Sequence, residues 1–259
     1  MLKTFNKHIK WREDRKGLLI CDCKRLIDMV LPLKYLNTIK KFHEGVEEDD
    51  LFGEEGLILS DFKKMNFLAN LEVRQIKKEE FEDAMKILDN ELGKNRVRSK
   101  EFLREKFNED SELFIGVFLD QEMIGFICGF PREDYFLLSE IAIDIRFQGR
   151  SFGKKLINLF ELIAKKKGFR KFQAGSEDHA IGFYYSLGYE PFLLIQYKKL
   201  YNENSFKGMD IFDKKIFGEY DALYVNVKKK DVKKETLIKL REKYPEASFQ
   251  YIFTKNFIK

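Results

Sequence analysis

Cysteine is scarce in this chain: Cys21, Cys23 and Cys128 are the three thiols among 259 residues. Three thiols cannot build the disulfide framework of a small secreted protein, and the first residues form no apolar segment of signal-peptide length. Long hydrophobic runs are also missing. The run from Ile124 to Phe130 is short and is interrupted by two glycines, so it does not suit a membrane span. We therefore expect a cytoplasmic protein with no membrane partner.

Charge of one sign is not in large excess either. The 48 Lys and Arg residues oppose 43 Asp and Glu residues, which leaves a formal net charge of +5. This excess is spread over mixed-sign stretches, so nucleic acid is not an expected partner. Hydrophobic residues make up 44% of the chain and include 26 Phe, which indicates a packed core rather than disorder.

The first 69 residues favour a small domain made of a hairpin and helices. The segment from His8 to Asp22 contains two strand-like runs around a turn at Arg15 to Gly17, which predicts a β-hairpin. An apolar stripe predicts a helix from Leu33 to Glu44, ended by Gly45. A hairpin followed by short helices resembles the winged-helix-like domains of pyrroloquinoline-quinone biosynthesis D type, which bind peptides beside modifying enzymes. The other interpretation is a plain structural extension.

From residue 71 onward the predicted elements follow one another closely. Strand patterns predict strands at residues 71–76, 113–119, 123–130, 136–145, 172–174 and 190–200. Helical spacing of apolar residues predicts helices at residues 78–92, 99–107, 153–167 and 180–187, with Ser99 as an N-cap.

The C-terminal part is less regular. Residues 202–221 are polar and are interpreted as a linker with one amphipathic patch at residues 211–217. A strand, a helix and a strand are then predicted at residues 222–227, 231–244 and 248–258. Asp231 is the predicted N-cap of this helix, and Pro245 follows its end.

Alternating aromatic residues mark the last predicted strand. Phe249, Tyr251 and Phe253 share one strand face, which makes the tail a candidate for sheet extension or for pairing in a homodimer. Taken together, the patterns divide the chain into three expected domains, residues 1–69, 70–200 and 201–259.

The stretch from Ile141 to Lys167 carries the most chemical information. An apolar strand pattern ends at Ile145, a loop with Gly149, Ser151 and Gly153 follows, and a long amphipathic helix begins. N–H groups at a helix start lack intrahelical partners, and small residues let an anion approach the backbone closely. This order predicts an anion site, and a pyrophosphate is its natural occupant.

A second motif lies downstream of this loop. The loop reads QGRSFG at residues 148–153, and residues 180–189 read AIGFYYSLGY. In these motifs, and in the order of elements between them, residues 71–199 resemble the GNAT superfamily of acyl-CoA-dependent N-acyltransferases. The resemblance implies an α/β (α+β) fold with a mixed, mostly antiparallel sheet flanked by helices. A small N-terminal α/β domain and a C-terminal strand-helix-strand extension would complete the chain.

The resemblance also implies acetyl-CoA as co-substrate and no metal. The strand before the loop would pair with the pantetheine arm through its backbone, and an N–H near Ile143 would polarise the thioester carbonyl. Arg150 and Lys154 would add screened positive charge beside the pyrophosphate. The implied CoA-binding residues are Ile141, Ala142, Ile143, Gln148, Gly149, Arg150, Ser151, Phe152, Gly153 and Lys154.

Ser151 departs from the family pattern, which has glycine at this position. Glycine is used where the backbone must approach a ligand closely or where φ is positive. A serine would be tolerated here if φ were negative, and its hydroxyl could donate to a phosphate oxygen. The alternative is that the cofactor site has decayed.

Tyr184 matches the general acid of the family, which protonates the departing CoA thiolate. The alternative is a hydroxyl that only anchors its helix, and the neighbouring Tyr185 illustrates that aromatic residues here need not be catalytic.

Glu140 is the candidate general base, since it lies on the strand that leads to the site. The family's commonest base positions hold Tyr135 and Leu137 here. Other carboxylates in loops that could face the site are Glu133, Asp134 and Glu177.

Cys21 and Cys23 lie one residue apart, with His8 and His43 nearby in sequence. The remaining ligands of a four-coordinate zinc site are missing, so we expect no metal.

Two functions are compatible with these features. The first is an N-acetyltransferase that acts on a primary amine of a peptide, protein or small molecule, by direct attack in a ternary complex. The second is a non-catalytic CoA-sensing or peptide-binding module on the same scaffold.

Overall fold

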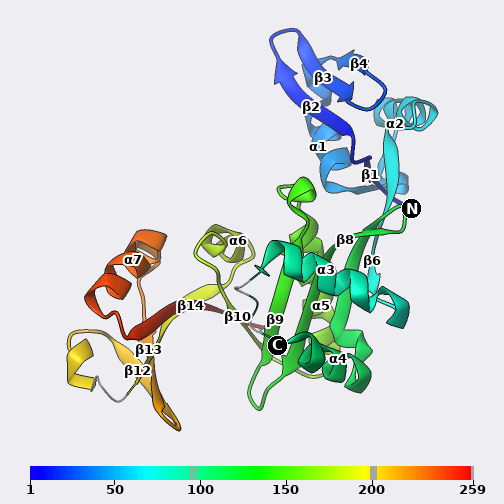
Figure 1. The fold of residues 1–259 in the computed structure, drawn as a ribbon. Coiled ribbons are helices and arrows are strands. Elements are labelled where there is room, and N and C mark those ends of the chain that lie inside the picture. The colour runs from blue at the N-terminus through cyan, green and yellow to red at the C-terminus, as the bar shows by residue number, and fades with distance from the viewer. Residues whose placement is uncertain (94–95, 97, 199–202, 258–259) are drawn as a thin grey trace. The chain divides into compact units, whose positions relative to one another are not determined.

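The computed structural model describes residues 1–93, 96, 98–198 and 203–257 (Figure 1). Its contacts divide the chain into two compact units. The first unit comprises Met1–Cys128 and Glu140–Ile163, and the second comprises Gly129–Ser139 and Ala164–Lys259. The three domains expected from sequence follow chain order instead, and that division stays a prediction.

The N-terminal segment of the first unit contains the predicted hairpin. Strands β2 (Ile9–Asp14) and β3 (Gly17–Asp22) pair antiparallel, and β4 (Ile27–Leu31) pairs with β3. The predicted helix is also confirmed: α1 (Leu36–Glu44) ends at Gly45, whose φ of 90° suits glycine. Helix α2 spans Glu54–Lys64. The buried core of this segment contains three aromatic rings with centroids 5.2–5.8 Å apart, those of Phe5, Phe42 and Phe62.

A sheet connects this segment to the rest of the first unit. Its strand order is β5-β1-β6-β7-β8-β9, and the pairs from β5 to β8 are antiparallel. All six residues of β7 are buried, so this strand forms the centre of the core. The bounds are β1 Leu2–Phe5, β5 Val46–Glu47, β6 Leu68–Gln75, β7 Phe114–Leu119, β8 Glu122–Pro131 and β9 Phe136–Ile143.

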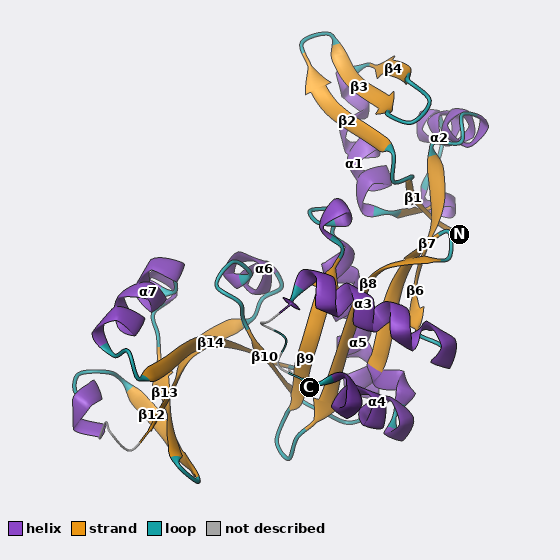
Figure 2. Cartoon of the chain, in the orientation of Figure 1, coloured by secondary structure: helices purple, strands orange, loops and turns teal. Residues whose placement is uncertain are grey.

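Three helices flank these strands. Helices α3 (Phe81–Glu91) and α4 (Lys100–Glu109) lie on the near side of the sheet in Figure 2, and α5 (Phe152–Lys166) lies on the far side. Ser99 caps α4 as predicted, because its side chain accepts a hydrogen bond from the Phe102 N–H at 3.2 Å. The sheet and helices confirm the mixed α/β class.

The second unit contains the C-terminal strands in the order β9-β10-β14-β11-β13-β12. The pair β9–β10 is parallel, whereas β10–β14, β14–β11, β11–β13 and β13–β12 are antiparallel. The bounds are β10 Lys171–Gly175, α6 Ile181–Ser186, β11 Glu190–Lys198, β12 Ile211–Phe217, β13 Tyr220–Asn226, α7 Lys234–Lys243 and β14 Ala247–Asn256. Short 3₁₀ turns occupy Leu33–Tyr35, Glu48–Asp50, Lys78–Glu80, Ser111–Leu113, Ile145–Phe147, Glu203–Phe206 and Lys229–Asp231.

Strand β14 extends the sheet of this unit, as one of the two interpretations of the tail predicted. It inserts between β10 and β11, so both of its hydrogen-bonding edges are occupied. Phe249, Tyr251 and Phe253 are at most 2% exposed. The idea that this strand pairs with a second copy is therefore wrong.

The predicted linker is wrong where it covers residues 211–217. This segment is strand β12, which pairs with β13 through a turn at Gly218 and Glu219. Asp231 is not the N-cap of α7, since it lies in a 3₁₀ turn and Lys233 precedes the helix. The predicted strand end at residues 199–200 lies outside the described residues. Among those described, no helix combines the length and apolar character needed to cross a membrane.

Candidate active site

Strand β9, a loop and helix α5 contain the residues that the sequence predicts to bind an anion. The end of β9 is held by the Asp144 N–H, which donates to the Ile124 carbonyl at 2.9 Å. The chain then makes a 3₁₀ turn at Ile145–Phe147, rather than continuing the strand to residue 145 as predicted. Phe147 and Phe152 are each 1% exposed. The loop from residue 148 to 151 thus runs between two buried aromatic anchors.

The backbone of this loop adopts two left-handed residues. Gly149 has φ 74° and Ser151 has φ 59°. Left-handed residues in turn-like backbone form concave sets of N–H groups that bind anions. The condition under which a serine would be tolerated here, a negative φ, is not met, so this serine holds a conformation that glycine adopts with less strain.

The Gln148 side chain braces the loop internally. Its Nε2 donates to the Ile143 carbonyl at 2.9 Å and to Glu91 Oε2 at 3.3 Å, while the Ile145 N–H donates to Glu91 Oε1 at 3.1 Å. Glu91, at the end of α3, was not among the predicted site residues. No local sequence pattern signals it, because it contacts the loop across more than 50 residues.

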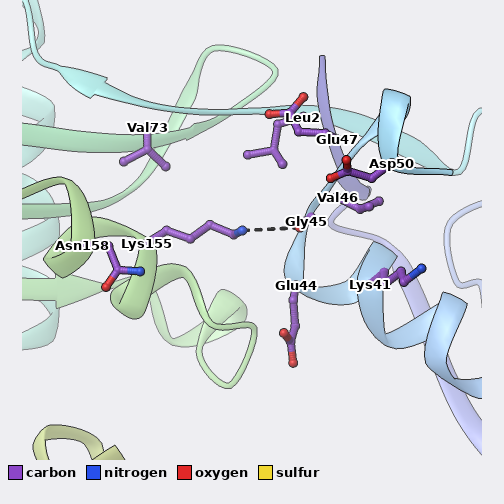
Figure 3. A pocket seen from close by; sticks show the side chains of 10 residues that line it. All are labelled: Leu2, Lys41, Glu44, Gly45, Val46, Glu47, Asp50, Val73, Lys155 and Asn158. Atoms are coloured by element: carbon purple, nitrogen blue, oxygen red, sulfur yellow. Dashed lines mark hydrogen bonds between the residues drawn. The ribbon is translucent and has the colours of Figure 1, made fainter. Parts of the chain in front are cut away.

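Arg150 does not present its charge on the surface of the loop, contrary to expectation. It is 6% exposed, and its guanidinium donates to groups of the N-terminal segment. Its backbone N–H stays among the predicted phosphate-binding groups. Lys154 is exposed, whereas Lys155 is half-buried and donates to the Gly45 carbonyl at 3.3 Å (Figure 3).

A cavity of about 620 Å³ lies beside this lysine (Figure 3). Its charged lining residues are Lys41, Glu44, Glu47, Asp50 and Lys155. None of the predicted site residues is among the described residues that line it. The cavity is therefore separate from the predicted phosphate-binding loop.

Glu140 is buried on β9, with 3% exposure. It accepts a hydrogen bond from the Arg98 N–H at 3.1 Å. Burial, followed by the negative charge of Glu140, raises the pKa of the neighbouring Cys128 thiol well above its usual range. By contrast, Glu133 and Asp134 are exposed. Of these three carboxylates, Glu140 is thus the buried one.

Tyr184 is buried in α6 of the second unit, with 3% exposure. Its ring stacks on Phe253 at 5.1 Å and meets Tyr189 edge-on at 5.7 Å. Burial, followed by the negative charge of Glu177, raises the pKa of the Tyr184 phenol. The phenol is therefore protonated at neutral pH, as a proton donor must be.

Residues 72–189 match the model of the acetyltransferase (GNAT) family, and this match covers both motifs. The chain contains a GNAT domain. A search among curated proteins found no match.

Several solved structures are similar to the chain in fold. N-acetylglutamate synthase from Neisseria gonorrhoeae, complexed with coenzyme A and N-acetyl-glutamate, is 12% identical with a TM-score of 0.45; the match covers 74% of this chain and 36% of that chain. A putative acetyltransferase from Pyrococcus horikoshii is 10% identical with a TM-score of 0.45, covering 73% and 90%. Ard1 from Thermoplasma volcanium is 16% identical with a TM-score of 0.42, covering 61% and 99%.

Around the GNAT domain the chain has additions on both sides. The matched residues begin within β6 and end just after Gly188. The N-terminal segment that holds Arg150 lies outside the match, as do β11 to β14. The loop at residues 148–153, which lies inside the match, is thus held in part by residues outside it.

Proposed function

We propose that this protein is an N-acetyltransferase that transfers an acetyl group from acetyl-CoA to a primary amine. The observation that carries the proposal is the loop between β9 and α5, with left-handed backbone at Gly149 and Ser151 just before the helix start. This geometry suits the pyrophosphate of CoA, because unpaired helix-start N–H groups bind anions. The match to the GNAT family supports the same ligand.

In this proposal the CoA site has two parts. The backbone of Ile141, Ala142 and Ile143 pairs with the pantetheine arm. The N–H groups of the loop and first helical turn hold the pyrophosphate, and they belong to Gln148, Gly149, Arg150, Ser151, Phe152, Gly153 and Lys154. The exposed Lys154 adds positive charge that is weakened by solvent.

The reaction needs a general base, a hydrogen-bond donor that stabilises the oxyanion, and a general acid. A neutral amine attacks the thioester carbonyl, an N–H near Ile143 stabilises the tetrahedral oxyanion, and CoA leaves as a thiolate. Glu140 is the proposed base that removes the amine proton, and its place on β9, the strand that leads to the loop, supports the assignment. Tyr184 is the proposed acid that protonates the thiolate.

The acceptor is proposed to be a primary amine of a peptide, a protein or a small molecule. The N-terminal segment, with its hairpin and helices, favours a peptide or protein acceptor. A cytoplasmic location and the absence of nucleic-acid and membrane partners remain predictions from the sequence.

A non-catalytic module is the second candidate, and Ser151 favours it. A serine at φ 59° keeps a strained loop where the family pattern has glycine. If the wild type bound no CoA and Ser151→Gly restored binding, the site would be a decayed one.

Thiol release from acetyl-CoA across a panel of amines, peptides and polyamines tests the first function. We expect release that depends on both acetyl-CoA and the amine, with acetylated product detected by mass spectrometry. CoA binding by calorimetry without amine-dependent release or acetyl-CoA consumption would favour the second candidate.

A further inference from the structure

The Arg150 side chain leaves the loop and enters the N-terminal segment. Its Nη2 donates to Thr4 Oγ1 and to the Phe5 carbonyl, each at 2.7 Å, and its Nε donates to the His43 carbonyl at 3.2 Å. The Thr4 hydroxyl in turn donates to the Phe42 carbonyl at 2.8 Å. These partners precede Arg150 by 107 to 146 positions, so the contact joins distant parts of the chain.

Neutral groups surround this guanidinium. In the described part of the chain its hydrogen-bond partners are one hydroxyl and two carbonyls. The rings of Phe152 and Phe147 lie 4.9 and 5.9 Å from it. Burial lowers the pKa of Arg150 to about 10. Burying a charge without an ionic partner costs free energy in the folded state. Stability alone therefore does not explain this arrangement, which suits a residue that positions the loop.

Two further contacts tie the loop to the end of α1. The His43 imidazole shares a hydrogen bond with the backbone of Gly149. Beyond the loop, Lys155 Nζ donates to the Gly45 carbonyl at 3.3 Å (Figure 3). The last carbonyls of a helix lack intrahelical partners and carry partial negative charge, which attracts the positive side chains of Arg150 and Lys155.

Arg150 stands between the two left-handed residues, Gly149 and Ser151. Fixing its side chain therefore fixes the direction of the peptide groups on both sides. Those peptide groups carry the N–H donors assigned to the pyrophosphate. A loop held in its binding conformation before the ligand arrives loses less entropy on binding.

We propose that the N-terminal segment pre-organises the pyrophosphate loop, and that Arg150 is the positioning residue through which it acts. This inference rests on the proposed function, since it deepens the account of the same CoA site. Thr4, Phe5 and His43 are the acceptors that hold Arg150 in place.

Three variants test this proposal. Arg150→Lys keeps the positive charge but cannot reproduce the forked contacts of a guanidinium. Thr4→Val removes one acceptor; because Thr4 is fully buried, it cannot touch CoA itself. Arg12→Gln is the matched control, since it removes an exposed arginine of the same segment whose ion-pair partner is Asp14.

Two measurements are made on the full-length chain. Calorimetry gives the CoA dissociation constant, and hydrogen exchange of amides 148–153 is followed without ligand. We expect Arg150→Lys to weaken CoA binding at least tenfold and Thr4→Val about threefold or more, with non-additive losses in the double variant. KM for acetyl-CoA should rise, while KM for the amine stays unchanged. Hydrogen exchange of amides 148–153 should accelerate. The control Arg12→Gln should match the wild type.

The outcomes separate the two proposals. Wild-type protein that binds no CoA overturns the proposed function, while the exchange data still decide whether Arg150 orders the loop. If amides 148–153 exchange at the wild-type rate in both Arg150→Lys and Thr4→Val, the positioning role is overturned. A thermal melt of each variant identifies global unfolding, and Thr4→Val then carries the test if Arg150→Lys does not fold.

Discussion

Ser151 sits in a backbone conformation that disfavours a side chain. A non-glycine residue in the left-handed region costs about 1–2 kcal/mol. Replacing it with glycine removes this cost, but glycine loses about 0.5–1 kcal/mol more chain entropy on folding. We expect Ser151→Gly to stabilise the protein by about 0.5–1 kcal/mol, or ~1–4 °C in melting temperature. Ser151→Ala is the control, because it removes the hydroxyl and keeps the strain; an equal gain in both variants would contradict this account.

Tyr184 is a buried phenol whose pKa is raised by burial. Removing a general acid typically lowers turnover by about 10²–10⁴-fold. We expect Tyr184→Phe to lower kcat by about 10²-fold or more, with the wild-type profile lacking a decline from phenol ionisation between pH 6 and 9. Tyr185→Phe is the control, since its buried hydroxyl has no partner among the described residues. Unchanged turnover in Tyr184→Phe would remove the acid role.

Protonation of His43, which contacts the loop, makes the stability of the protein depend on pH. Burial, followed by the charges of Arg150 and Lys10, lowers its pKa to about 4 from an ordinary value of 6.5. The unfolded chain therefore takes up a proton below pH 6.5, whereas the folded chain does so only near pH 4. Stability is lost through this group as pH falls across that window.

Melting temperature against pH checks this prediction. We expect His43→Gln to show a shallower loss of melting temperature between pH 6.5 and 4 than the wild type. His179→Gln is the control, because His179 is exposed. Parallel curves for His43→Gln and the wild type would show that this histidine does not contribute.

At the scale of elements, helix α1 depends on its terminating glycine. Gly45 has φ 90°, and a Cβ added there would lie 2.6 Å from Leu71 Cδ2. We expect Gly45→Ala to destabilise the protein by about 1–3 kcal/mol in denaturant unfolding, because both strain and a clash arise. Gly56→Ala is the control: it lies inside α2 with its nearest neighbour at 3.5 Å, and replacing a helical glycine is stabilising by about 0.5–1 kcal/mol.

Local patterns predicted most of the elements of the GNAT domain. Helices α3, α4 and α5 and strands β6 to β11 lie within a few residues of their predicted positions, since apolar periodicity and caps act over short distances. Strand β12 was missed because Asp213, Lys214 and Lys215 interrupt its apolar pattern. These polar residues fit a strand at the sheet edge, where no buried face is required.

The sequence indicated where the loop lies, but it did not indicate the residues that support the loop. The acceptors of Arg150 lie 107 to 146 positions away, and those of Gln148 include Glu91. No spacing rule links such residues before the chain folds. The sign of φ at Ser151 also depends on this surrounding structure, so the residue type alone left it open.

At the scale of the whole molecule, β14 completes the second unit. It pairs with β10 on one side and with β11 on the other. We expect a variant that ends at Glu246 to lose the folded second unit, seen as rapid proteolysis after residue 163 and as accumulation in the insoluble fraction. A variant that ends at Phe257 keeps all of β14 and serves as the control. Protease resistance of the shorter variant would contradict the structural role of β14.

The place of β14 in the sheet has a consequence for synthesis. A ribosome makes β10 and β11 well before β14, yet these two strands are joined through β14 rather than to each other. While β14 is still being made, each growing chain displays two strand edges with free N–H and C=O groups, which invite pairing with other chains. Slow translation between residues 199 and 246 would prolong that exposure. The yield of soluble protein should therefore respond to synonymous codons in this stretch, although the amino-acid sequence is unchanged.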